Sequence, residues 1–303
     1  CEIFRAIQKA RPMSRETFRD YALQKMIENQ KSSLQRFGVH FQRFSHESSF
    51  RNSGRSAQVI EELRRRGYTY EKDGALWFKT REFQDDMDRV LVKSDGEFTY
   101  VVPDVAYHVD KLERGYDRLI DLLGPDHHGH VPKLRAALRA LGYLSEKLEV
   151  LVVQWVTFHR GGEKVAMSKR EGEFITMDEL MDEVGVDAAR FFFLMRKASA
   201  HLDFDLDLAK KRSEENPVYY AQYAHARISS IFRHAEERKV RLPSLEEVDL
   251  SLLKEEEFSV VRKLIAFPEL VQSSARSLEP HRIPFYLLEL ATLFHNYYQK
   301  QRV

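Results

Sequence analysis

Hydrophobic positions along this sequence follow two patterns, one typical of helices and one typical of short strands. Apolar residues that recur about every three to four positions, with few glycines or prolines between them, predict helices. The predicted helices are residues 16–31, 56–66, 105–114, 131–141, 177–184, 186–197, 217–238, 252–278 and 283–301. An aromatic-rich stretch with alternating apolar residues also predicts a strand within 34–44.

Two Asp-Gly pairs predict β-hairpins. Asp73-Gly74 and Asp95-Gly96 each lie between β-prone runs. A tight type I′ turn needs positive φ at both central residues. Asp and Gly tolerate this conformation, so each pair is expected to form the turn of a hairpin.

An alternating α/β region precedes a purely helical one. Strand 117–123, helix 131–141 and strand 148–156 have the spacing of a βαβ unit, so the two strands are expected to be parallel. From Thr176 onward the pattern is helical only. The sequence therefore predicts an α/β domain, a boundary near 210–215 and an all-α region after it.

Composition narrows the class of protein. A length of 303 residues suggests about two domains, and 43% apolar with 31% charged residues is typical of a folded chain. With 48 Lys+Arg and 47 Asp+Glu the net charge is +1, so a globally basic nucleic-acid coat is excluded and any polyanion site must be local. The single cysteine, Cys1, excludes an internal disulfide and a cysteine-built zinc site.

The apolar runs and the chain ends bear on location and completeness. The runs 150–158 and 283–294 are too short or too interrupted to span a bilayer, and no signal peptide is visible, so we expect an intracellular protein without membrane segments. The chain begins with Cys1 instead of Met and ends after an apolar helical pattern, so we expect a piece of a longer protein.

Two glycine-containing loops follow predicted strands, where open α/β sheets bind ligands. In 124–130, glycines allow close backbone approach and the next helix start offers N–H groups to anions. In 161–172, glycines flank Lys164, Lys169 and Arg170, which suits a loop that closes over phosphates. A solvated basic hairpin is an equally simple interpretation of the second loop.

Three histidines and an aspartate in the first loop raise the question of a metal site. His127, His128 and His130 lie beside Asp126, and these residue types bind zinc. Adjacent histidines rarely point at one centre without ligands from another segment. We therefore predict hydrogen-bonding roles and no metal.

Tyr100 and Asp104 lie four residues apart, on either side of Pro103. If Asp104 begins the next helix, its simplest role is an N-cap, and the spacing favours that role. The functional alternative is a carboxylate that faces a cationic ligand in an open crevice. A carboxylate turned into bulk water, or occupied by an internal basic partner, would contradict that alternative.

The start of the helical region carries a polar and aromatic motif. Asn216 fits an N-cap and Pro217 fits the first helical turn. Tyr220, Tyr223 and Arg227 share one helix face. An aromatic core stripe is the commoner interpretation of such a face, and a platform for unstacked RNA bases is the functional one.

These motifs, in this order, resemble the bacterial-type arginyl-tRNA synthetases, a family of class I aminoacyl-tRNA synthetases. The resemblance extends from about Gly38 to Phe232. It is carried by residues 98–108, 124–129, 167–170 with 174–176, 184–193, 201–206 and 216–225. It implies an α/β, Rossmann-like parallel-sheet catalytic domain (partial), with inserted hairpins, over 1–212. An all-α anticodon-binding helical domain would follow over 213–303.

The resemblance also implies an activity and its partners. The activity is that of an arginine–tRNA ligase, which uses ATP to activate L-arginine to arginyl-adenylate and transfers the arginine to tRNA(Arg). ATP and Mg²⁺ are the implied cofactors, and L-arginine and tRNA(Arg) are the implied partners. The protein is expected to be a monomer in the cytoplasm.

Roles for single residues follow from matching positions in the family. The implied arginine-binding residues are Tyr100, Asp104 and His128. The implied ATP-binding residues are Gly124, Asp126, Met167 and Lys169. The second class I signature loop, with its catalytic role, is Met167, Ser168 and Lys169. The implied tRNA-binding residues are Asn216, Tyr220, Tyr223 and Arg227.

The chain departs from the family pattern in two places. Ala166 replaces the first lysine of the signature loop, which leaves Lys169 as its main cation. The first class I signature, a His-x-Gly-His sequence that the family carries N-terminal to its other motifs, is also missing there, since the one such sequence in the chain, residues 127–130, belongs to the loop after Gly124. We therefore expect that these 303 residues cannot activate arginine alone. Three alternatives to an arginyl enzyme stay open. One is a cysteinyl-tRNA synthetase, which the single cysteine of the chain argues against, and another is a non-catalytic tRNA- or RNA-binding module. The third is an unrelated α/β nucleotide-binding protein, which the order of the motifs disfavours.

Overall fold

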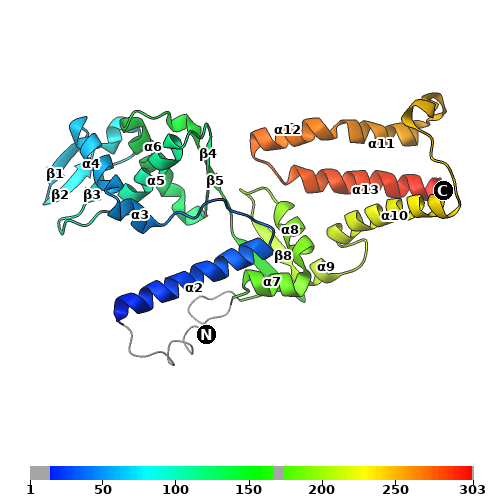
Figure 1. The fold of residues 1–303 in the computed structure, drawn as a ribbon, viewed down its shortest axis with the longest axis horizontal. Helices are drawn as coiled ribbons and strands as arrows, with labels where there is room; N and C mark the ends of the chain where they lie inside the picture. The colour runs from blue at the N-terminus through cyan, green and yellow to red at the C-terminus, as the bar shows by residue number, and fades with distance from the viewer. Residues whose placement is uncertain (1–13, 167–173, 302–303) are drawn as a thin grey trace. The chain divides into compact units, whose positions relative to one another are not determined.

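The computed structural model describes residues 14–166 and 174–301 (Figure 1). The chain divides into two compact units, which are described separately. The first, called the 41–155 unit, comprises residues 41–155 and 198–201. The second, called the helical unit, comprises residues 1–40, 156–197 and 202–303.

The 41–155 unit combines helices with a small antiparallel sheet and a parallel strand pair. Its helices are α3 (Glu47–Asn52), α4 (Arg55–Arg65), α5 (Val101–Glu113) and α6 (Val131–Ala140), with 3₁₀ turns η1 (Thr80–Phe83), η2 (Pro125–His130) and η3 (Ser145–Lys147). Its strands are β1 (Thr69–Lys72), β2 (Ala75–Phe78), β3 (Arg89–Val92), β4 (Leu119–Leu123) and β5 (Leu148–Val152).

The first Asp-Gly pair forms the predicted hairpin turn. Strands β1 and β2 are antiparallel, and Asp73 and Gly74 have φ of 54° and 70°, as a type I′ turn requires. At the second pair, β3 meets the returning chain through one bridge only, between Val92 and Phe98. No second strand forms there, because the chain enters α5 at Val101 almost immediately.

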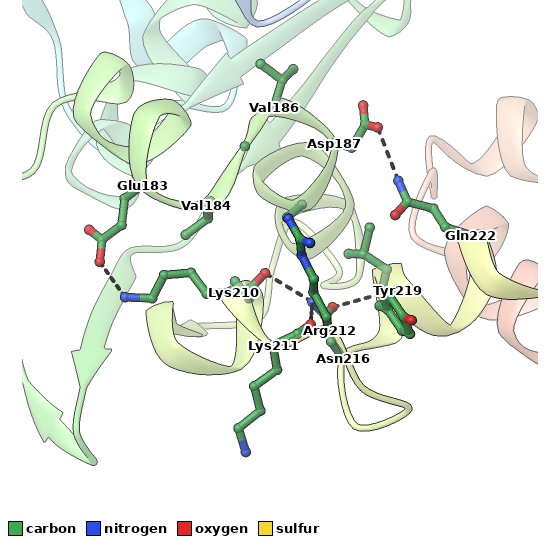
Figure 2. Close-up of a pocket in the computed structure, with 14 residues that line it drawn as sticks. Glu183, Val184, Val186, Asp187, Lys210, Lys211, Arg212, Asn216, Tyr219 and Gln222 are labelled. Atoms are coloured by element: carbon green, nitrogen blue, oxygen red, sulfur yellow. Dashed lines mark hydrogen bonds and ion pairs between the residues drawn. The ribbon is translucent and has the colours of Figure 1, made fainter.

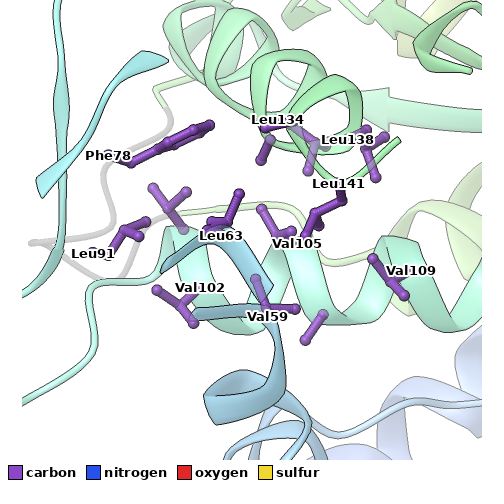
Figure 3. Close-up of a cluster of buried hydrophobic side chains, with 14 of the residues drawn as sticks. Val59, Leu63, Phe78, Leu91, Val102, Val105, Val109, Leu134, Leu138 and Leu141 are labelled. Carbon is purple, nitrogen blue, oxygen red and sulfur yellow. The ribbon is translucent and has the colours of Figure 1, made fainter. Parts of the chain in front are cut away.

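The predicted βαβ unit is confirmed. Strands β4 and β5 are parallel, with Leu119 opposite Leu148, and α6 lies between them in sequence. Apolar side chains of α4, α5, α6, β2 and β3 meet in one buried cluster beside these strands (Figure 3). Its labelled members are Val59, Leu63, Phe78, Leu91, Val102, Val105, Val109, Leu134, Leu138 and Leu141. This cluster fixes α5 and β4, the elements on which the site below is built.

The helical unit contains a second small sheet and most of the helices. Its helices are α2 (Arg15–Arg36), α7 (Met177–Val184), α8 (Val186–Leu194), α9 (Leu206–Lys210), α10 (Pro217–Glu237), α11 (Glu255–Ile265), α12 (Phe267–Ser277) and α13 (Arg282–Lys300), with 3₁₀ turns η4 (Leu245–Glu247) and η5 (Leu250–Leu252). Its strands are β6 (Val156–Arg160), β7 (Glu163–Lys164) and β8 (Leu202–Asp205). Strand β6 pairs in parallel with β8 and antiparallel with β7. Phe158, Phe192 and Phe204 pack together in its core.

Two sequence predictions about strands were wrong. No strand forms within 34–44, because α2 continues to Arg36 and Gly38, at φ 75°, turns the chain so that Val39 N–H donates to Leu34 O (2.8 Å). The predicted strand 148–156 is two strands, since β5 ends at Val152 and β6 begins at Val156 in the other sheet.

One predicted helix is divided and one strand was missed. The helix expected over 252–278 is α11 and α12, which meet at Ala266, just before Pro268. Proline has no N–H to donate, so a helix readily restarts there. Strand β8 was not predicted, although Leu202 and Phe204 alternate with exposed Asp203 and Asp205. In the described part of the chain, no helix is long and apolar enough to cross a membrane.

Candidate functional site

Asp104 lies in the first turn of α5 and is not its N-cap. Helix α5 begins at Val101, Tyr100 occupies the N-cap position, and no side chain caps the helix. Pro103 is tolerated in this turn because the first amides of a helix have no internal partner. The N-cap role favoured by spacing is therefore wrong, and the Asp104 carboxylate is available for other contacts.

Two histidines contact the Asp104 carboxylate from within the 41–155 unit. His130 Nε2 hydrogen-bonds to Asp104 Oδ2, and His108 Nδ1 lies 3.5 Å from Asp104 Oδ1. Burial opposes ionisation of this carboxyl, but the contacts with His108 and His130 hold its pKa well below the usual range. The carboxylate is thus ionised and held at fixed geometry.

His108 is charged for a geometric reason. Its Nδ1 donates to the backbone carbonyl of Asp104 at 2.8 Å, and its Nε2 donates to Asp121 Oδ2 at 2.7 Å. Both partners can only accept, so both ring nitrogens must carry a proton. Although burial disfavours the cation, the contacts with Asp104 and Asp121 raise the pKa of His108 to about 9. Lys111 Nζ, 2.9 Å from Asp121 Oδ1, completes the network.

Asp104 also lines a cavity of about 280 Å³ in the 41–155 unit. The cavity is lined by Ser45, Glu47, Phe50, Tyr100, Pro103, Asp104 and Tyr107. A crevice is therefore present at Asp104, but its carboxylate has internal basic partners in His108 and His130, which is one of the two outcomes named above as contradicting a cation ligand. With 32% of the Asp104 side chain still exposed, its arginine-binding role stays a prediction.

Glu47 is a second carboxylate in this cavity that the sequence reasoning missed. It lies at the first residue of α3 and pairs with Arg51 at 2.7 Å, and the side chains of Glu47 and Arg51 are 61% and 32% exposed. Such an exposed pair contributes at most about 1 kcal/mol, so a ligand cation can replace Arg51 at little cost. No local pattern marks Glu47, because 57 residues separate it from Asp104 and only the packing of α3 on α5 brings the two to one cavity.

The predicted nucleotide loop has one geometric reason for its glycine. A Cβ at Gly124 would lie 2.8 Å from Asp126 Oδ1, so glycine leaves room for the Asp126 carboxylate. Asp126 and His127 are exposed at the start of η2. The side chain of His128 lies outside the described part of the structure, as do Met167, Ser168 and Lys169. Among the described residues, no group of three His, Cys, Asp or Glu side chains is placed to hold a metal ion.

Asn216 is a buried N-cap, the alternative that its position in the sequence favoured. Its Oδ1 accepts from the N–H of Val218 (3.0 Å), and its Nδ2 donates to the carbonyls of Ala209 (3.0 Å) and Lys211 (2.8 Å). Only 4% of the residue is exposed. Asn216 therefore joins α9 to α10 and presents no side-chain group to a partner.

The face formed by Tyr220, Tyr223 and Arg227 packs against α13. Tyr220 donates to Thr292 (3.3 Å), and Arg227 contacts His295 Nδ1 (3.1 Å) and donates to the Tyr223 hydroxyl (2.8 Å). The Arg227 guanidinium lies 4.5 Å and 4.8 Å from the ring centroids of Tyr223 and Tyr298. This is the arrangement expected of an aromatic core stripe, with partial exposure of all three residues.

A larger cavity, of about 980 Å³, lies in the helical unit where α7, α8, α9 and α10 meet (Figure 2). Three consecutive cations, Lys210, Lys211 and Arg212, line it. Lys210 pairs with Glu183 (2.9 Å) and Lys211 with Glu215 (2.6 Å), while Arg212 has no ion-pair partner within the described residues. Glu183 and Asp187 line the same cavity, so its charge is mixed and Arg212 is the cation among these three that a polyanion could bind without displacing an ion pair of the described residues.

Comparison with known proteins identifies the family. Residues 2–215 match the family described as "tRNA synthetases class I (R), catalytic domain". The chain belongs to the class I arginyl-tRNA synthetase family. Residues 221–303 match the "DALR anticodon binding domain". The family resemblance and the fold class, an α/β catalytic region followed by a helical anticodon-binding region, are thereby confirmed.

Individual arginyl-tRNA synthetases agree with this membership. The chain is 51% identical over 287 residues to an arginine–tRNA ligase of Syntrophotalea carbinolica, and the match covers 94% of the chain and 52% of that relative. It is 47% identical over 287 residues to an arginine–tRNA ligase of Bacillus pumilus, with 94% and 51% coverage. The chain thus spans about half the length of the curated relatives that it matches.

Solved structures have the same architecture. A Campylobacter jejuni structure that carries a provisional arginyl-tRNA synthetase name is 32% identical, with a TM-score of 0.87, and covers 96% of this chain and 64% of its own. The Thermus thermophilus arginyl-tRNA synthetase is 21% identical, with a TM-score of 0.76 and 95% and 58% coverage, which supports the fold alone.

Proposed function

We propose that this chain provides part of an arginine–tRNA ligase, which activates L-arginine with ATP and transfers it to tRNA(Arg). The observation that carries the proposal is the cavity that Asp104 and Glu47 line together with Tyr100 and Tyr107. A planar guanidinium offers several N–H donors in a fixed fork, so paired carboxylates bind it better than they bind a point cation. The predicted contact from His128 would add to this set.

In this reaction the protein side chains mainly align the substrates and compensate charge. The arginine carboxylate attacks the α-phosphate of ATP, arginyl-adenylate forms, and pyrophosphate leaves. A ribose hydroxyl of the tRNA 3′ end then attacks the adenylate carbonyl and AMP leaves. Gly124 and Asp126 would hold the nucleotide, and the loop Met167, Ser168 and Lys169 would compensate charge on the leaving pyrophosphate. Mg²⁺ would enter bound to ATP and would neutralise part of the phosphate charge.

The tRNA would bind along the helical unit. Arg227 with Tyr220 and Tyr223 offers a partly exposed cation and aromatic rings, and Arg212 lines the larger cavity beside α10. Asn216 would support this surface from within, as the cap of α10. The proposal includes a monomeric protein in the cytoplasm.

A non-catalytic tRNA-binding module is the second candidate, because the one His-x-Gly-His sequence in the 303 residues, 127–130, follows the Tyr100 and Asp104 motif, whereas the first signature of the family precedes it. Measurements of L-arginine binding and of catalytic turnover distinguish the ligase from the non-catalytic module. We expect isothermal titration calorimetry to detect L-arginine binding to the 303-residue chain, and ATP–pyrophosphate exchange with arginine and tRNA to be absent. Asp104→Asn should weaken arginine binding about 10- to 100-fold, because a charge-assisted contact is lost. Exchange by the chain alone would contradict the expected inactivity, and unchanged binding in Asp104→Asn would contradict the proposed substrate site.

A further inference from the structure

His130 contacts the Asp104 carboxylate but does not line the cavity. It is 9% exposed, at the junction of η2 and α6, and its Nε2 hydrogen-bonds to Asp104 Oδ2. Its ring lies 5.2 Å from the ring of Tyr100, which does line the cavity. His130 is thus a buried neighbour of the carboxylate and not part of the cavity wall.

The surroundings of the other ring nitrogen of His130, Nδ1, indicate the protonation and the role of this side chain. Its Nδ1 is buried and has no hydrogen-bond partner among the described residues. A proton on Nδ1 would be a buried, unpaired donor, so the geometry favours the neutral tautomer with its proton on Nε2. The bond to Asp104 is then the one polar interaction that the described part of the structure gives this ring.

We propose that His130 is a positioning residue for the arginine-binding carboxylate. It donates to Asp104 Oδ2 from inside the fold, while the charged His108 approaches Oδ1, so the carboxylate is fixed with its remaining lone pairs toward the cavity. This inference rests on the proposed function, since it concerns the same carboxylate.

The surrounding charges agree with a fixed carboxylate. On α5 and β4, His108 and Lys111 are balanced by Asp104 and Asp121, and on α6 Lys133 lies 3.2 Å from the Tyr100 hydroxyl. His108 and Lys111 divide their charge between two carboxylates, so Asp104 keeps part of its attraction for a guanidinium. A neutral donor at His130 orients Asp104 without adding a third cation beside it.

Two substitutions separate the hydrogen bond from the ring. His130→Phe keeps an aromatic ring beside Tyr100 but has no donor, whereas His130→Gln keeps an N–H donor and loses the ring. We expect the dissociation constant for L-arginine to rise about tenfold or more in His130→Phe and to recover largely in His130→Gln. His127→Phe, on the exposed face of the same turn, is the matched control and should leave binding unchanged. Equal losses in the Phe and Gln variants would overturn the inference, because ring packing alone would then explain them.

A second measurement needs no arginine. In ¹³C NMR of aspartate carboxyl groups, with the Asp104 signal assigned through Asp104→Asn, the Asp104 carboxyl should titrate well below the usual range in the wild-type chain. Its pKa should rise in His130→Phe and recover in His130→Gln. An unchanged titration in His130→Phe would overturn the inference. Absence of arginine binding to the wild-type chain would instead contradict the proposed function, while the carboxyl titration still tests His130.

Discussion

Asp121→Asn removes one of the two carboxylates that keep His108 charged, so the free energy of unfolding of the 41–155 unit should depend less on pH. In the wild-type protein, Asp121 accepts from His108 (2.7 Å) and from Lys111 (2.9 Å), and the His108 side chain is only 3% exposed. Asparagine has nearly the same shape but no charge. Two neighbouring cations, His108 and Lys111, then lose their shared counter-ion.

The size of the effect follows from the raised pKa of His108. The ordinary pKa of 6.5 and the pKa of about 9 in the folded protein differ by an amount worth about 3 kcal/mol. Because the folded-state pKa is the higher one, this stabilisation is complete below pH about 6.5 and disappears as pH rises through about 9. The shifted carboxyl groups titrate at lower pH and the shifted tyrosines at higher pH, so His108 accounts for the change in this window.

Tryptophan fluorescence reports on the unfolding of the 41–155 unit. Both tryptophans of the chain, Trp77 and Trp155, lie in the 41–155 unit. In urea denaturation, the free energy of unfolding of the wild-type unit should fall by about 3 kcal/mol between pH 6.5 and 9. Asp121→Asn should be less stable at pH 6.5 and should show a clearly smaller fall over the same range, because the contact of His108 with Asp104 remains. Asp117→Asn, whose side chain is fully exposed two residues before β4, is the matched control. A wild-type pH dependence retained in Asp121→Asn would refute the argument.

Two further substitutions test single structural conclusions. Asn216→Ala removes three hydrogen bonds of a buried cap, and we expect a loss of about 2–3 kcal/mol in the unfolding free energy of the helical unit, followed by circular dichroism in urea; a loss near zero would mean that the cap is dispensable. Gly74→Val places a β-branched residue at φ 70° and should cost about 1–2 kcal/mol in the tryptophan-monitored unfolding of the 41–155 unit. An unchanged midpoint for that variant would contradict the type I′ turn.

Local sequence patterns predicted most elements of the fold. Apolar residues at helical spacing predicted α4, α6, α7, α8 and α13 to within a few residues, because one helix face must be buried wherever the helix packs. Asp73-Gly74 predicted its turn because few residue types accept positive φ. The ordered motifs also predicted the family, which the comparisons confirmed.

Contacts between distant parts of the chain determine which side chains meet at the candidate site, and no local sequence pattern predicted them. Spacing favoured Asp104 as an N-cap, yet its carboxylate lies among His108 and His130 and shares a cavity with Glu47. The physical reason is that a local pattern reaches only a turn or so along the chain. The state of a buried charge depends on every group that packing brings within a few ångströms, and the packing of α3, α5, β4 and η2 supplies those groups from positions up to 83 residues apart.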